Sequence, residues 1–309
     1  MKQNQHSSDF SQRVNKIFSD RYNTLVEKTD RLFGYLFIFQ WILGIIFALF
    51  ISPRTWSGEF SQTHIHVYAA LFLGGLIASL PVFLIFTNPG ATLNRMVVGV
   101  SQILFSVLLI HLTGGRIETH FHVFGSLAFL AFYRDWRVVL VGTVVTAVDH
   151  LVRGAFWPQS VYGVLAATPW RAIEHAAWVV FEDFILFYSI KLALGELRSV
   201  SESHVELEDK TKQLALERNR VKMLFDVAVV ANHSKMPSDA MEQALSQICR
   251  YAGWPVGHAY IVSNDNPELL LPTQQWYLKN TESFQSFRDI SEKTILKIGI
   301  GLPGRVFEQ

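Results

Sequence analysis

Histidines stand beside acidic residues at the ends of several apolar segments of this chain. The pattern is clearest in Glu118-Thr-His120-Phe-His122, where one carboxylate and two imidazoles open an apolar run. It recurs along the chain, and the residues involved are His64, His66, His111, Glu118, His120, His122, Asp149, His150, Glu174, His175 and Glu182. Ionisable side chains at the edge of a bilayer are costly unless they are paired, hydrated or bound to metal. Their concentration therefore predicts a functional site.

Imidazole and carboxylate side chains together form the ligand sets of iron, copper and zinc sites. We therefore expect these residues to bind transition metal ions. The set exceeds the roughly four to six ligands that one ion takes, so we expect two or more ions. Two alternatives remain open. One is haem held by two histidines on different helices, and the other is proton binding by imidazoles that titrate near neutral pH.

Spacing adds detail to the ligand set. Glu118 and His122 are four residues apart and share one helix face, whereas His120 points about 160° away from His122. The two histidines therefore predict either two metal ions or a segment that is not yet helical at His120. Arginines also flank the carboxylates, and an arginine that pairs with one of them would remove that acid from the ligand set. The arginines concerned are Arg116, Arg153 and Arg171.

Six apolar segments must position these side chains. The chain has 309 residues, of which 50% are hydrophobic and 17% charged, a composition too apolar for an ordinary soluble protein. About 20 apolar residues cross the hydrocarbon core of a bilayer. The expected spans are residues 32–52, 66–86, 96–112, 119–133, 138–152 and 172–190. The fourth and fifth are short, so their polar ends must be drawn in or the bilayer must thin locally.

Lys and Arg residues are distributed unequally between the two sides of these spans. They concentrate in the N-terminal segment, in the loops before the third span and after the fourth, and beyond the sixth. Because positively charged loops stay in the cytoplasm, this bias predicts a multi-pass membrane protein with both termini inside. The seven histidines of the set then lie at one level, on the outer side, among membrane lipids.

The residues after the last span change in character. Apolar residues between Leu197 and Phe225 follow a 3-4 spacing, which predicts a coiled coil and a homodimer. A soluble portion follows, with a helix expected at 240–251 and a strand at 257–262. We expect four parts: a cytoplasmic N-terminal helix at 1–31, a six-span sensor domain at 32–191, a signalling helix at 192–225 and a partial domain at 226–309. The net charge of +1, without a basic stripe, argues against a nucleic-acid partner.

Two parts of the sequence resemble known families. The stretches that begin at Gly253 (GWPVGHAY) and Gly299 (GIGLPGRV) are similar to the first part of a GAF domain. The stretches that begin at Glu118, Asp149 and Glu174 resemble the multi-span input region of bacterial sensor histidine kinases and diguanylate cyclases. The resemblance implies a bacterial inner-membrane protein with a downstream kinase or cyclase module and a response regulator. The expected fold is mainly α: a six-transmembrane-helix bundle, a signalling coiled-coil helix and a partial α+β GAF domain.

The expected function is therefore that of a membrane sensor region, most consistent with a sensor histidine kinase, with a metal site at the periplasmic rim. A membrane oxidase or hydroxylase of the di-iron type is the alternative, because such enzymes also carry histidine-rich boxes on their spans. Their boxes usually have three- or four-residue spacing and face the cytoplasm, whereas the pairs here are His-x-His and face outward. We expect no catalytic module within residues 1–309.

Overall fold

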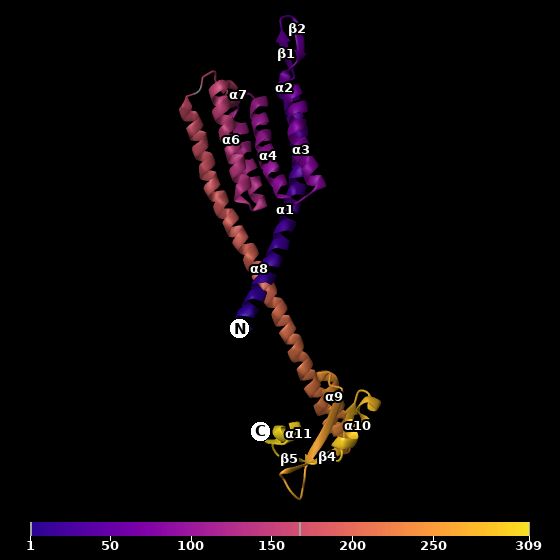
Figure 1. Ribbon diagram of the computed structural model, residues 1–309. Coiled ribbons are helices and arrows are strands. Elements are labelled where there is room, and N and C mark those ends of the chain that lie inside the picture. The colour runs from indigo at the N-terminus through magenta and orange to yellow at the C-terminus, as the bar shows by residue number, and fades with distance from the viewer. Residues whose placement is uncertain (1, 167, 309) are drawn as a thin grey trace. The chain divides into compact units, whose positions relative to one another are not determined.

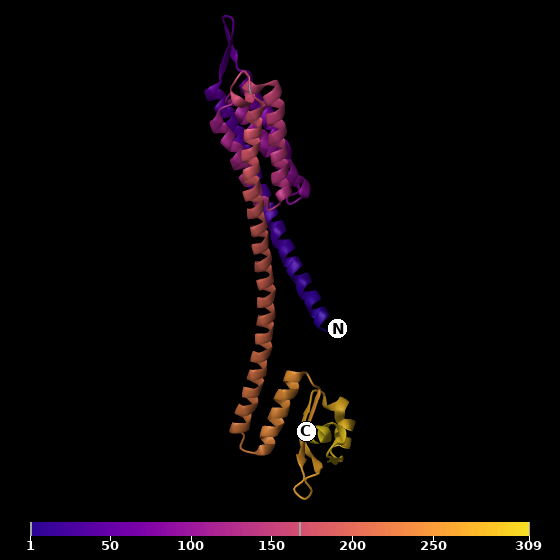
Figure 2. The same cartoon turned by 90° about the vertical axis from the view of Figure 1, so that its left-hand side faces the viewer.

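The computed structural model describes residues 2–166 and 168–308. The chain divides into two compact units, Met1–Glu206 and Leu207–Gln309. The first unit is helical apart from one hairpin, and in Figures 1 and 2 its helices run alongside one another. The second combines helices with a small antiparallel sheet. The expectation of a mainly α fold is confirmed.

The first unit begins with one long helix and ends within another. Its elements are α1 (Lys2–Ile51), β1 (Arg54–Ser57), β2 (Phe60–Thr63), α2 (Ile65–Tyr68), the π-helical turn η1 (Ala69–Leu73), α3 (Gly74–Thr87), α4 (Thr92–Leu112), α5 (Ile117–Leu130), the 3-10 turn η2 (Ala131–Tyr133), α6 (Trp136–Phe156), α7 (Pro158–Tyr162) and α8 (Pro169–His233). Helix α8 continues unbroken into the second unit. The segment at 53–63, which the sequence presents only as a polar link, forms the β1–β2 hairpin.

Four helical segments of the described chain are long and apolar enough to cross a membrane. They are Ser7–Ile51, Ile65–Thr87, Thr92–Leu112 and Trp136–Phe156. Helix α5 has 14 residues, which at about 1.5 Å per residue is shorter than the hydrocarbon core of about 30 Å. The first part of α8 is apolar but carries Glu182 and Asp183. Four of the six expected spans thus have a matching helix, and the other two stay predictions.

A buried carboxylate joins three parts of the helical unit. Asp30 of α1, which is 0% exposed, accepts hydrogen bonds from the Tyr133 hydroxyl and the Gly90 backbone N–H, each at 2.7 Å. The Tyr133 ring stacks on Phe33 with ring centroids 5.4 Å apart. A buried charge needs such partners, because leaving one unpaired is costly. This cluster fixes α1 against the loop before α4 and the turn after α5.

The second unit is built on three antiparallel strands. Its elements after α8 are α9 (Pro237–Ala252), β3 (Val256–Val262), β4 (Leu269–Leu278), α10 (Thr281–Ser291), β5 (Leu296–Lys297) and α11 (Gly301–Glu308), with strand order β3-β4-β5. The helix expected at 240–251 and the strand expected at 257–262 lie within α9 and β3. Cys249 of α9 is buried against β3, and this burial raises the pKa of its thiol.

We predict that Tyr133→Phe lowers the free energy of unfolding by about 1.5–3 kcal/mol, because it removes a hydrogen bond to a buried charged group. The measurement is chemical unfolding of the detergent-solubilised chain. Tyr35→Phe is the matched control, since Tyr35 is 65% exposed. Equal unfolding curves for the two variants would contradict the role assigned to Asp30.

We also predict that Gly257→Ala destabilises the second unit by about 1–3 kcal/mol, the usual range for overpacking. A Cβ atom at this position would collide with the Cys249 sulfur atom. Gly253→Asn is the control, because the left-handed backbone there, with φ of 70°, tolerates asparagine and no side chain lies against it. The thermal midpoint of each variant gives the comparison, and an unchanged midpoint for Gly257→Ala would show that α9 and β3 are not tightly packed.

Candidate functional site

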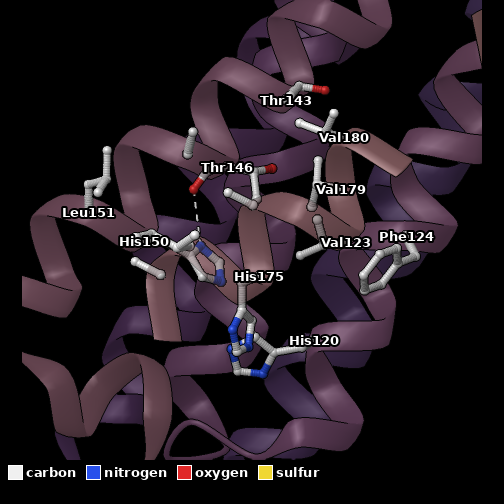
Figure 3. A pocket seen from close by; sticks show the side chains of 14 residues that line it. His120, Val123, Phe124, Thr143, Thr146, His150, Leu151, His175, Val179 and Val180 are labelled. Atoms are coloured by element: carbon white, nitrogen blue, oxygen red, sulfur yellow. Dashed lines mark hydrogen bonds between the residues drawn. The ribbon is translucent and has the colours of Figure 1, made fainter. Parts of the chain in front are cut away.

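Three imidazoles from three different helices lie together in the first unit. They belong to His120 of α5, His150 of α6 and His175 of α8 (Figure 3). Their ring centroids are 5.5 Å apart for His120 and His150, 5.3 Å for His120 and His175, and 5.7 Å for His150 and His175. We call these three residues the imidazole cluster.

Each ring of the imidazole cluster is held by the turn that precedes it in its own helix. The Nδ1 atoms of His120, His150 and His175 lie 2.9, 3.1 and 2.8 Å from the carbonyl oxygens of Arg116, Thr146 and Arg171, respectively. A carbonyl oxygen only accepts hydrogen bonds, so Nδ1 must be the donor. In the neutral ring Nε2 then carries a free lone pair. His120 and His150 are 4% and 5% exposed, and Nε2 of His120 has no hydrogen-bond partner within the described residues.

Tyr162 is a member of this site that the sequence did not reveal. Its ring lies 5.4 Å from His175 and 6.3 Å from His150, and its hydroxyl is buried without a partner among the residues described. The ring has room because residue 154 is glycine, where a Cβ atom would come within 3.0 Å of it. In a sequence, a tyrosine between two apolar segments is typical of the membrane interface. Only the fold of α7 shows that it reaches the imidazoles.

Three other histidines form a second group, at the base of the hairpin and the end of α4. The rings of His64 and His66 are 4.2 Å apart, and those of His66 and His111 are 4.9 Å apart. Nδ1 of His64 accepts the His66 backbone N–H, so His64 caps α2. Trp157 lies against the His111 ring, with 5.0 Å between centroids.

An arginine connects the two groups of histidines. Arg153 donates to both oxygens of Asp149 at 2.6 Å and to the Ser160 hydroxyl at 3.0 Å. Ser160 in turn bonds His111 at 2.8 Å, and Asp149 lies 3.3 Å from Nδ1 of His150. The sequence predicted that arginines would pair with some of the acids, and Asp149 is such an acid. Both oxygens of Asp149 therefore already accept hydrogen bonds from Arg153, which removes this acid from the ligand set.

The remaining predicted site residues lie apart from both groups. His122 faces the bundle interior, where Nδ1 bonds Ser106 at 2.8 Å and Nε2 lies 3.4 Å from Gln40. Glu118 and Glu174 are exposed, and Glu182 lies about two turns beyond His175 on α8. Within the described residues, no group of three or more His, Cys, Asp and Glu side chains could hold a metal ion as it stands. The predicted set is thus divided into two groups of three, Asp149 beside His150 of the imidazole cluster, and four separate residues.

A cavity of about 350 Å³ opens beside the imidazole cluster, between α8 and the other helices. Besides the three histidines, its wall includes Val123, Phe124, Thr143 and Thr146 (Figure 3). A second hollow of about 710 Å³ shares His120, His175 and Phe124 with it and continues between α5 and α8. Hollows therefore line the contact between α8 and the bundle, which we call the α8 seam.

Comparison with known proteins gives one partial similarity. The chain is 40% identical over 67 residues to "Transducer protein Htr8" of the archaeon Halobacterium salinarum. The match covers 21% of this chain and 10% of that relative. This chain has a region like that of a membrane sensory transducer. No protein family model matches the chain, and no solved structure does.

We predict that Arg153→Gln lowers the unfolding free energy of the chain by about 3 kcal/mol, because it removes the only arginine bonded to the largely buried Asp149 carboxylate in the described part of the chain. Arg171→Gln is the control, since the side chain of Arg171 is exposed. Unfolding in detergent with increasing denaturant measures both. A loss no larger than that of the control would mean that the Arg153–Asp149 pair does not hold the site together.

Proposed function

We propose that this chain is the membrane input region of a signal-transduction protein and that it reads its signal at the imidazole cluster. The observation that carries the proposal is the position of the cluster. His120 and His150 belong to the bundle, whereas His175 belongs to α8, which runs without interruption to His233. A ligand that binds all three rings changes the contact between the bundle and α8. The partial similarity to a transducer supports the same reading.

We propose a transition metal ion, iron, copper or zinc, as the ligand of the cluster. Ligand histidines usually donate their other ring N–H to a carbonyl or carboxylate, and all three rings already make such a bond. The three rings would have to turn so that their Nε2 atoms converge, and Tyr162 stands beside them as a fourth ligand, through its hydroxyl oxygen. The group of His64, His66 and His111 supports a second ion, in keeping with the expectation of two or more.

The rest of the protein is proposed from the sequence. The six-span arrangement has both termini in the cytoplasm, and the apolar spacing on α8 supports a homodimer. Leu207, Leu214 and Val221 follow a seven-residue interval and are 65%, 70% and 62% exposed, so they are available for a second copy. A kinase or cyclase module and a response regulator would then take up the signal. The GAF assignment of residues 226–309 belongs to the same proposal.

The test is metal content per chain, measured by mass spectrometry on protein purified in detergent without a metal-affinity column. We predict at least one equivalent of iron, copper or zinc, and a loss of about one equivalent in His150→Phe. His233→Ala is the control, because Nδ1 of His233 makes the same bond to the carbonyl of the preceding turn, at 2.9 Å, but His233 lies in the second unit. Metal-free protein, or equal content in the two variants, would contradict the metal proposal.

A further inference from the structure

We infer that the cavity beside the imidazole cluster binds a lipid-soluble quinol, an aromatic ring with two opposed hydroxyl groups, in preference to the corresponding oxidised quinone. The inference rests on the proposal that the signal is read at this cluster. It does not require that a metal be present. Binding alone is proposed, with no transfer of electrons or protons.

The polar side chains of the cavity wall offer acceptors. The imidazole hydrogens are committed to backbone carbonyls, which leaves Nε2 lone pairs at one end. At the other end the Thr143 hydroxyl donates to Asp183 at 2.8 Å, and between the two ends the Thr146 hydroxyl donates to the Gly142 carbonyl at 3.0 Å. The wall therefore suits a ligand that brings its own hydrogens. A quinol has two O–H donors, whereas a quinone has only acceptors.

The two ends are separated by a suitable distance. Thr143 and His150 are seven residues apart on α6, which is about 10.5 Å along the helix axis. The oxygens of a quinol lie on opposite sides of one ring, and with a hydrogen bond of about 2.8 Å at each end the molecule spans about 11 Å. The cavity volume of about 350 Å³ is in the range of small-molecule pockets. One hydroxyl can thus reach His150 while the other reaches Thr143.

The cavity is also open to a molecule arriving from the lipid. Leu151, Ile173 and Val180 belong to its wall and are 61%, 56% and 47% exposed. The adjoining hollow of about 710 Å³ is lined by the aromatic side chains of Phe121, Trp178 and others. An apolar chain attached to the ring would lie along that hollow, between α5 and α8. The same molecule would therefore contact both sides of the α8 seam.

The test compares decylubiquinol, kept reduced under argon, with decylubiquinone, as two forms of one molecule. Binding to the full chain in detergent is measured by the shift of the thermal midpoint over a range of ligand concentrations, after treatment with a chelator. We expect the quinol to bind at least tenfold more tightly. Thr143→Val should weaken quinol binding about tenfold, because valine keeps the shape and loses the acceptor. Thr87→Val is the control, since Thr87 bonds its own helix away from the cavity.

Equal affinity for the two forms, or an unchanged quinol affinity in Thr143→Val, would overturn the inference. Added zinc should weaken quinol binding in the wild-type chain, because the metal and the hydroxyl use the same Nε2 lone pairs. Metal content measured on untreated samples separates the two proposals. Metal-free protein that still prefers the quinol would contradict only the metal proposal. Metal-bearing protein that shows no preference after chelation would contradict only the quinol inference.

Discussion

The hydrogen bond from Nδ1 of a histidine to the carbonyl of the preceding turn is the interaction on which the candidate site depends. It fixes which nitrogen carries the hydrogen and turns the other nitrogen away from the helix. One such bond is unremarkable on a helix. Here the same bond occurs on α5, α6 and α8, and the three rings that make it lie beside one cavity. The cavity chemistry, whether metal or quinol, follows from that orientation.

The second constraint is the small number of polar contacts that join α8 to the bundle among the residues that the structure describes. Asp183 accepts from Thr143, and Arg134 donates to the Ala193 carbonyl at 3.2 Å. Between and around these contacts lie the hollows of the α8 seam. By contrast, the Asp30 cluster and buried aromatic rings hold α1 to the helices beside it. A ligand in the seam would therefore move α8 more readily than the bundle, and α8 is the helix that leaves the membrane unit.

Much of the fold could be predicted because it depends on periodicity and length. The apolar runs anticipated the helical segment Ile65–Thr87, α4 and α6 to within a few residues. The spacing predicted that His120 and His122 face different ways, as they do. Periodicity could not predict how each helix is rotated about its axis relative to its neighbours. That relative orientation brings His120 close to His150 and His175, and His111 close to His64 and His66. Tyr162 and the β1–β2 hairpin were missed because short segments carry too few repeats for a pattern.

The most direct test of the central claim, that binding at the imidazole cluster shifts α8, is a distance between spin labels. Labels at Leu140→Cys on α6 and Tyr188→Cys on α8, both exposed positions, would be placed in a Cys249→Ala background. Pulsed electron paramagnetic resonance would measure the distance between the two labels in metal-loaded and in chelated samples. We predict a shift of about 1–2 Å, the usual size of signalling helix movements, and none in His150→Phe. Identical distances in the loaded and chelated wild-type chain, with metal demonstrably bound, would contradict the claim.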